Sequence, residues 1–296
     1  MRKAFLQLHI AIFLAGFTGI LGRLITLNAG LLVWYRLLIT CLTLWLIVLV
    51  RKKVLAVPYR DVMQIFFVGA IAALHWVTFY ASVKYANVSV ALVCFSAIGF
   101  FTALLEPLIL KTKHSRFEVL LGLMTIAGIY IIFHFDPQYK TGIILGIISA
   151  ILGSLFPIYN KRFLEKHAPE TVTIYELTGG FIFLTLLIPI YLILVPADHI
   201  FPTLGDFGWL LVLSWLCTVV AFNLLMNALK RISAFTVNLS YNLEPVYGIL
   251  LAFIIYRENE LLRTSFYIGL LLIVMSVVMQ TMLMERERRK VGEIKS

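Results

Sequence analysis

Charged residues are scarce in this chain of 296 residues. Lysine, arginine, aspartate and glutamate together make up only 14% of it, whereas 61% of the residues are hydrophobic. A soluble domain could not cover its surface with so few polar groups. The mean hydropathy of +0.96 therefore predicts a protein that lies in a membrane.

Cysteine is also rare, and the motifs of common catalytic sites are missing. Cys41, Cys94 and Cys217 each fall in an apolar stretch without metal-binding spacing, so we expect free buried thiols and no metal site. The sequence contains no phosphate loop, zinc signature or nucleophile elbow. It therefore predicts no cofactor, no ATP hydrolysis by the chain itself and no enzyme activity.

Long apolar segments, in contrast, are abundant. A helix needs roughly 20 residues to cross a bilayer, and ten segments of about that length can be drawn. They are residues 4–22, 30–50, 62–83, 88–110, 117–135, 141–160, 172–194, 207–229, 235–256 and 264–284. The predicted fold class is an all-α polytopic membrane protein with ten transmembrane helices.

The positive charges are unevenly placed along these segments. Nineteen of the 25 basic residues fall at the chain ends or in the connections on the same side as the ends. Loops rich in lysine and arginine stay in the cytoplasm, so we expect both termini there and the protein in the cytoplasmic membrane. The net charge of +10 thus suits anionic lipid headgroups, and nothing beyond total charge suggests nucleic acid.

Two stretches of the chain are alike at a separation of 146 residues. Residues 84–105 contain KYANVS and then FSAIGFFTALL, and residues 230–251 contain KRISAF and then YNLEPVYGILL. Five spans in each half make the second half enter the membrane from the opposite side. We therefore expect two inverted five-helix repeats, at residues 4–135 and 141–284, followed by a cytoplasmic tail at residues 285–296.

The second of these stretches places polar groups in the middle of a predicted span. Hydrocarbon offers no hydrogen bonds, so such groups must face other helices or a water-filled cavity. Pro245 has no amide hydrogen, so the carbonyl of Tyr241 loses its helical partner and the helix can bend. Glu244 could bind a substrate amine, exchange a proton or serve only as a structural side chain. We expect the segment from Asn238 to Tyr247 to line a transport cavity.

Two further ionisable residues lie inside predicted spans of the first half. Arg36 is roughly 9 Å from the outer end of its span, so it could reach the headgroups or bind an anion at a cavity wall. His75 lies near the middle of the third span, where it could relay protons or pack as a neutral, hydrogen-bonded side chain. The approximate counterpart of Arg36 in the second half is Glu176, for which no ion pair with Arg36 is predicted.

The repeated segments resemble the EamA branch of the drug/metabolite transporter superfamily. The likeness rests on KYANVSVAL with FFTALL in the first half, and on ALKRISA with LEPVY and Arg257-Glu258 in the second. It covers nearly the whole chain and implies a cytoplasmic-membrane carrier with a central cavity, of a kind that commonly exports amino acids, related metabolites or toxic organic compounds. The first copy departs from the family pattern because Ile98-Gly99 replaces its usual Ser-Pro or Glu-Pro.

The predicted function is therefore secondary transport, with export of amino acids or related small metabolites by alternating access. Phosphorylated-metabolite or nucleotide-sugar exchange is one alternative, and a membrane-embedded enzyme or a non-transporting scaffold is another. The expected partners are a small-molecule substrate and membrane lipid, with proton coupling and a homodimer left open. The residues expected to bind substrate are Arg36, His75, Trp76, Tyr80, Asn223, Asn227, Tyr241, Asn242 and Glu244.

Overall fold

The structure is a computed structural model of the chain. It describes residues 2–52, 56–111, 116–135, 137–232, 234–241 and 243–293. Every regular element in these ranges is helical and none of them is a strand, in agreement with the predicted all-α class.

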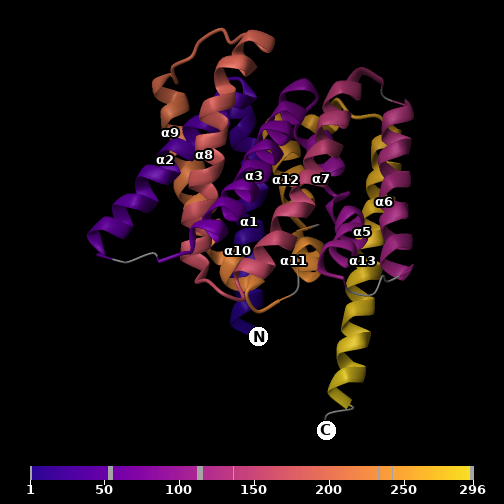
Figure 1. The fold of residues 1–296 in the computed structure, drawn as a ribbon. Helices are drawn as coiled ribbons and strands as arrows, with labels where there is room; N and C mark the ends of the chain where they lie inside the picture. Colours follow the sequence, from indigo (N-terminus) through magenta and orange to yellow (C-terminus); the bar gives the residue numbers. More distant parts are fainter. Residues whose placement is uncertain are drawn as a thin grey trace.

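The helices lie side by side in one bundle (Figure 1). The α-helices are α1 (Arg2–Leu24), α2 (Ala29–Val50), α3 (Tyr59–Tyr85), α4 (Val88–Phe95), α5 (Ile98–Leu110), α6 (Arg116–Phe135), α7 (Lys140–Phe163), α8 (Pro169–Leu194), α9 (Leu204–Ser214), α10 (Ala221–Leu229), α11 (Ala234–Tyr241), α12 (Leu243–Tyr256) and α13 (Thr264–Glu293). Shorter turns are η1 (Pro137–Tyr139), the π-helical η2 (Trp215–Val220) and η3 (Glu258–Glu260).

Seven helical segments are long and apolar enough to cross a membrane. They are Lys3–Leu24, Ala29–Val50, Tyr59–Tyr85, Val88–Leu110, Lys140–Phe163, Pro169–Leu194 and Leu204–Leu229. Three shorter apolar helices cover Val119–Ile132, Leu243–Tyr256 and Thr264–Ser276. The chain is thus a multi-pass membrane protein, while the count of ten spans stays a prediction.

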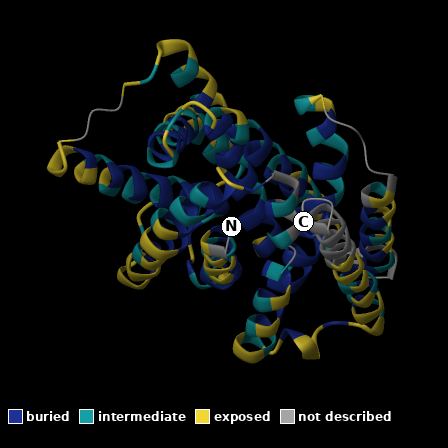
Figure 2. Cartoon of the chain, turned by 90° about the horizontal axis from the view of Figure 1, so that it is seen from below, coloured by how far each residue is buried: buried dark blue, intermediate teal, exposed yellow. Residues whose placement is uncertain are grey.

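Burial in the bundle follows the pattern of a membrane protein. Figure 2 shows buried residues in the middle and exposed residues around the outside. The exposed residues include large apolar side chains such as Leu186, Ile193 and Ile254. An apolar outer surface of this kind is suited to contact with lipid chains rather than with water.

Helices α4 and α11 end at matching positions of the sequence repeat. α4 ends at Phe95 and α11 ends at Tyr241, which is 146 residues later. In the first copy the amide of Ser96 contacts the carbonyls of both Leu92 and Val93, and its hydroxyl donates to Leu92 at 3.2 Å. A serine that bonds to the carbonyl four residues back competes with the regular ladder, so this helix is interrupted without a proline.

The second copy contains the proline, in the first turn of α12. α12 begins at Leu243, so Pro245 is its third residue, where the missing amide hydrogen costs little. Tyr241, whose carbonyl that amide would otherwise bind, is the last residue of α11. The two copies therefore differ at this point: Ser96 competes with the regular ladder in the first, and Pro245 removes an amide hydrogen in the second.

An ion pair joins the two halves of the chain at one end of the bundle. Arg23, near the end of α1, bonds to the fully buried carboxylate of Glu258 in η3. Glu258 also accepts the amides of Val88 and Ser89, at 3.1 and 2.8 Å, and the Ser89 hydroxyl at 2.6 Å. A carboxylate at the first amides of a helix is a stabilising cap, so Glu258 fixes the start of α4.

Helices α3 and α8 approach each other closely through glycines. A Cβ atom added at Gly69 would lie 2.7 Å from the backbone nitrogen of Gly180, and it would also meet the carbonyl oxygen of Glu176. Backbone atoms cannot rotate away as a flexible side chain can. The position therefore admits no larger residue without a shift of one helix.

Replacing Gly69 by alanine is expected to destabilise the fold by about 1–3 kcal/mol, because the extra methyl group overpacks this contact. Thermal unfolding in detergent measures the effect. Gly208→Ala is the matched control, since a Cβ atom at Gly208 meets nothing within 4 Å. Equal melting temperatures for the two variants would contradict the close approach of α3 and α8.

Candidate functional site

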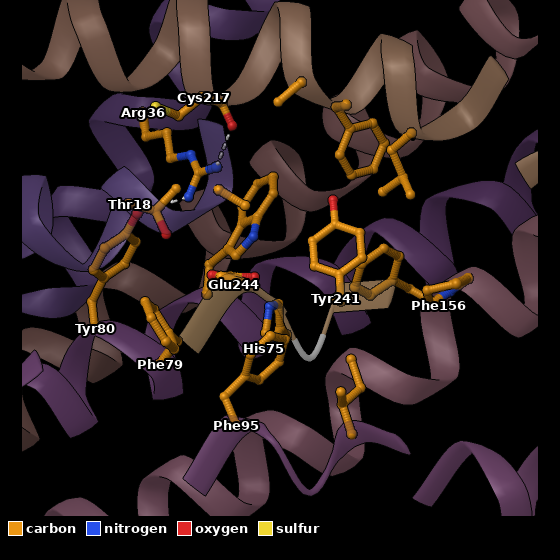
Figure 3. A pocket seen from close by; sticks show the side chains of 17 residues that line it. Thr18, Arg36, His75, Phe79, Tyr80, Phe95, Phe156, Cys217, Tyr241 and Glu244 are labelled. Atoms are coloured by element: carbon orange, nitrogen blue, oxygen red, sulfur yellow. Dashed lines mark hydrogen bonds between the residues drawn. The ribbon is translucent and has the colours of Figure 1, made fainter. Parts of the chain in front are cut away.

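A cavity lies in the middle of the bundle, where α1, α2, α3, α7, α10 and the first turn of α12 meet (Figure 3). The lining residues with charged or strongly hydrogen-bonding groups include Arg36, His75, Tyr241 and Glu244. The rest of the wall is mostly aromatic or aliphatic. It consists of Ala15, Thr18, Trp76, Phe79, Tyr80, Phe95, Ile98, Phe156, Pro157, Cys217, Ala221, Phe222 and Leu225.

Arg36 is held in the cavity wall by contacts with α3 and η2. Its Nε donates to the hydroxyl of Thr218 at 2.7 Å, and its Nη1 donates to the hydroxyl of Tyr80 at 2.9 Å. Nη2 donates to the carbonyl of Cys217 at 3.4 Å, and the guanidinium lies 3.9 Å from the ring centroid of Trp76. Only 3% of this residue is exposed, so it faces the cavity instead of extending to the headgroups.

The π-helical turn η2 supplies two of these contacts. The hydroxyl of Thr218 donates to the carbonyl of Leu213, five residues back, at 2.8 Å and accepts from Arg36 at the same time. A wider turn changes which carbonyls are bonded within the helix, and such turns occur often at functional sites. This local geometry places both Thr218 and the Cys217 carbonyl against the guanidinium.

Glu244 lies on the opposite half of the chain and faces the same cavity. It belongs to the first turn of α12, is 4% exposed, and lines the cavity together with Tyr241. The described residues provide no hydrogen bond and no ion pair to its carboxylate. A buried carboxylate near a helix N-terminus is favoured by the helix dipole, but it still lacks a direct partner.

Arg36 and Glu244 thus bring a guanidinium and a carboxyl group to the same cavity. No ion pair or hydrogen bond joins them in the part of the chain that the structure describes. Figure 3 shows both side chains, with Tyr80 and Tyr241 among the rings around them. A ligand with a negative and a positive group could satisfy both charges at once.

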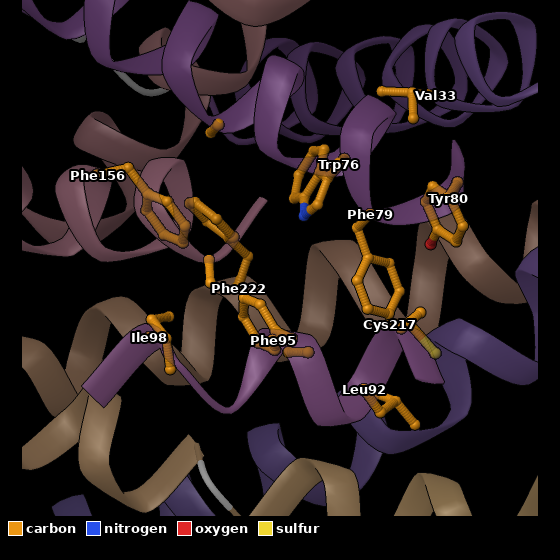
Figure 4. Packing of buried hydrophobic residues seen from close by; sticks show 14 of the residues in the cluster. Val33, Trp76, Phe79, Tyr80, Leu92, Phe95, Ile98, Phe156, Cys217 and Phe222 are labelled. Carbon is orange, nitrogen blue, oxygen red and sulfur yellow. The ribbon is translucent and has the colours of Figure 1, made fainter. Parts of the chain in front are cut away.

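Aromatic rings form the apolar part of the cavity wall (Figure 4). Phe156 stacks on Phe222 with ring centroids 6.2 Å apart, and Trp76 meets Phe222 edge to face at 6.2 Å. Phe79 and Phe95 also meet edge to face, at 5.8 Å. These rings come from α3, α4, α7 and α10, so helices from both halves build the apolar wall.

His75 is anchored to α7 through its Nδ1 atom. That atom lies 2.9 Å from both the carbonyl oxygen and the hydroxyl of Ser149, and the hydroxyl donates in turn to the His75 carbonyl at 3.1 Å. Gly153 makes room for the ring, because a Cβ atom there would lie 3.1 Å from Nδ1. The packing interpretation of His75 agrees with this geometry, although the ring also lines the cavity.

Six of the nine residues predicted to bind substrate meet in this cavity. They are Arg36, His75, Trp76, Tyr80, Tyr241 and Glu244. Asn242 lies outside the described residues. The structure does not bring Asn223 and Asn227 to the cavity.

The two asparagines are displaced because they lie on a different face of α10. The cavity side of this helix carries Ala221, Phe222 and Leu225, whereas Asn223 lines a separate crevice. Asn227 donates to the side-chain oxygen of Asn223 at 2.6 Å, one turn along the same helix. Their spacing does put them on one face, but nothing in the spacing tells which face meets the cavity.

Several residues that build the site were not predicted. Thr218 lies in the middle of a predicted span, and its hydroxyl could have drawn attention, but its contact with Arg36 depends on the π-helical turn. The aromatic residues Phe79, Phe95, Phe156 and Phe222 resemble any other apolar residue of a span. Only the tertiary packing separates them from rings that face lipid.

Comparison with known proteins agrees with the two-part organisation. Residues 2–134 and 140–282 each match the EamA-like transporter family. An uncharacterized transporter of Haemophilus influenzae is 28% identical over 164 residues, covering 52% of this chain and 53% of that protein. The matched region therefore spans about half the length of either protein.

A protein of known crystal structure has the same fold. It aligns with a TM-score of 0.69 at 19% identity, over 97% of this chain and 99% of its own length. The likeness shows the fold alone because the identity is low. The family matches cover both halves and confirm the resemblance drawn from the repeated motifs. The chain belongs to the EamA-like transporter family, within the drug/metabolite transporter superfamily.

Proposed function

We propose that this protein is a secondary transporter of the cytoplasmic membrane that exports amino acids or related small metabolites by alternating access. The observation that carries the proposal is the central cavity, in which Arg36 and Glu244 present opposite charges among aromatic rings. Secondary transporters bind their substrates near the middle of the membrane, between two repeats.

The chemistry of the cavity fits a zwitterion. The guanidinium of Arg36 can donate to a carboxylate, and the carboxylate of Glu244 can accept from an ammonium group. Trp76, Phe156 and Phe222 offer an apolar surface to the remainder of the molecule. In this arrangement the substrate bridges two charges that the protein leaves unpaired, so a neutral molecule with both groups is preferred over either ion alone.

The proposed architecture has ten transmembrane helices in two inverted five-helix repeats, at residues 4–135 and 141–284, with a tail at residues 285–296. The directions of α1 and α7 support the inversion, since α1 runs upward and α7 downward in Figure 1. The start of α1 and the end of α13 lie at the same end of the bundle, which supports an even number of crossings. The excess of basic residues on that side supports a cytoplasmic location for that end.

Exchange of phosphorylated metabolites or nucleotide sugars is the competing transport function. It needs several cations around the phosphates, whereas Arg36 is the single cation among the lining residues described and faces a carboxylate. The site therefore favours a zwitterion over a polyanion.

Counterflow in proteoliposomes tests the function directly. Vesicles loaded with an unlabelled zwitterionic amino acid are expected to take up the labelled compound transiently and saturably, because a carrier exchanges substrate without net flux. Amino acids with aromatic and aliphatic side chains are screened together with their amine-free and carboxylate-free analogues. A channel gives no saturable exchange, and a scaffold or enzyme gives none at all, so either result would count against the proposal.

A further inference from the structure

A second buried carboxyl group lies outside the central cavity, on α8. Glu176 is fully buried, and the Nδ2 atom of Asn160 on α7 donates to its Oε2 at 2.7 Å. Thr173 precedes Glu176 by three residues on the same helix, so the two side chains share a face. Thr173 is 1% exposed and Asn160 is fully buried.

Each of these three side chains has a buried polar atom without a hydrogen-bond partner among the described residues. Among the described residues, no partner is present for Oε1 of Glu176, Oδ1 of Asn160 or the hydroxyl of Thr173. A buried polar atom without a partner is costly, and three such atoms on neighbouring side chains call for a common explanation. A proton on Oε1 would convert one acceptor into a donor.

Among the described residues, Glu176 has an amide and no cation as its bonded partner. In the described parts of the chain, no lysine, arginine or histidine forms an ion pair or hydrogen bond with its carboxylate. The elements packed around it carry titratable or charged groups that include Arg36 and Cys41 on α2, Asp61 and His75 on α3, Tyr159, Lys161 and Arg162 on α7, and Glu170 and Tyr175 on α8. An ionised, unpaired carboxylate inside the membrane is expensive, so the site is suited to bind a small cation.

A crevice reaches one member of this cluster. Thr173 lines it between α2, α8, η2 and α10, among mainly aliphatic side chains. The same crevice contains Arg51 at the end of α2, Glu170 in the first turn of α8, and Asn223. Asn223, one of the residues expected in the central cavity, lines this crevice instead.

We propose that Glu176, with Asn160 and Thr173, forms a proton-binding site that couples transport to the proton gradient. The proposal rests on the transport function given above and separates the proton from the substrate, which binds at Arg36 and Glu244. A proton from water in the crevice adds to Oε1, so that the carboxylate becomes a neutral carboxyl group and hydroxide or water remains behind. On release, the O–H bond breaks, the proton passes to crevice water, and the carboxylate keeps its bond from Asn160.

The test compares Glu176→Gln with wild type in the same proteoliposomes. With one proton moved per substrate, a gradient of one pH unit drives about tenfold accumulation of a neutral zwitterion. The variant is expected to show normal counterflow, which needs no gradient, and no accumulation. Glu165→Gln is the control because Glu165 is exposed and lies in a different surface pocket. It should accumulate substrate like wild type.

Three results would overturn the proposal. Gradient-driven accumulation by Glu176→Gln excludes Glu176 as the proton site, and accumulation driven by a sodium gradient in wild type assigns another cation. Absence of counterflow in wild type overturns the transport function itself, and the coupling role with it.

A measurement on the wild-type protein covers the case in which Glu176→Gln does not fold. A hydrophobic carbodiimide reacts with protonated carboxyl groups in the membrane interior, and peptide mass spectrometry identifies the modified residue. Modification of Glu176 together with loss of gradient-driven accumulation is expected. Modification of other carboxyl groups alone would overturn the assignment.

Discussion

Replacing Glu244 by glutamine should weaken the apparent affinity for a zwitterionic amino acid by about 10- to 150-fold. A hydrogen bond to a charged group is worth about 1.5–3 kcal/mol, and glutamine keeps the shape of the side chain while removing its charge. The concentration dependence of counterflow measures the effect. The loss should fall on the substrate's ammonium group, because Glu244 has no described partner within the protein that the change would disrupt.

Two comparisons make the Glu244 result specific. Glu260→Gln removes an exposed carboxylate from the same half of the chain and should leave affinity unchanged. A substrate analogue without the amine should bind wild type and Glu244→Gln equally well. If Glu244→Gln binds the intact amino acid with wild-type affinity, the carboxylate has a structural role and does not bind the ammonium group of the substrate.

Replacing Arg36 by glutamine should have a still larger effect, with affinity reduced by about 100-fold or more. Removing one member of a buried, hydrogen-bonded charge pair typically costs about 2–5 kcal/mol. The substrate carboxylate loses its cation, and the Tyr80 hydroxyl and the Cys217 carbonyl lose their donors. Counterflow measured over a range of substrate concentrations gives the change in affinity.

Arg36→Lys distinguishes charge from geometry. Lysine keeps the positive charge but not the planar fork that reaches Thr218, Tyr80 and the Cys217 carbonyl together, so an intermediate affinity is expected. Arg231→Gln, at an exposed position, is the control for loss of one basic residue. If Arg36→Gln transports normally while its melting temperature falls, Arg36 stabilises the helix bundle and does not bind substrate.

Much of the architecture could be read from the sequence because membrane insertion imposes strong rules. Apolar runs of spanning length and basic residues on one side follow from the bilayer alone. The same constraint identified Glu244 and Arg36 as candidate site residues, because an ionisable side chain inside an apolar segment is rare and is often functional. The sequence similarity at a shift of 146 residues also showed which positions of the two halves correspond.

The part of the site that could not be predicted depends on how each helix is rotated about its own axis and on local helix geometry. Asn223 and Asn227 share a face with each other, yet the direction of that face is set by how α10 packs. The π-helical turn that brings Thr218 to Arg36 has no sequence signature comparable to a proline or a glycine. The aromatic wall could not be predicted either, because Phe156 and Phe222 differ from lipid-facing phenylalanines only in their neighbours.

The corresponding positions of the two repeats bear on how the two halves diverged. Two repeats of one family can occupy equivalent places in a bundle without sharing their side chains. At matching positions the first copy has Ile98-Gly99 and the second has Glu244-Pro245. The place in the bundle can thus be kept while the chemistry changes, so one copy contributes Ile98 to the cavity wall and the other contributes Glu244. Selection for a new substrate could act on either copy without rebuilding the scaffold.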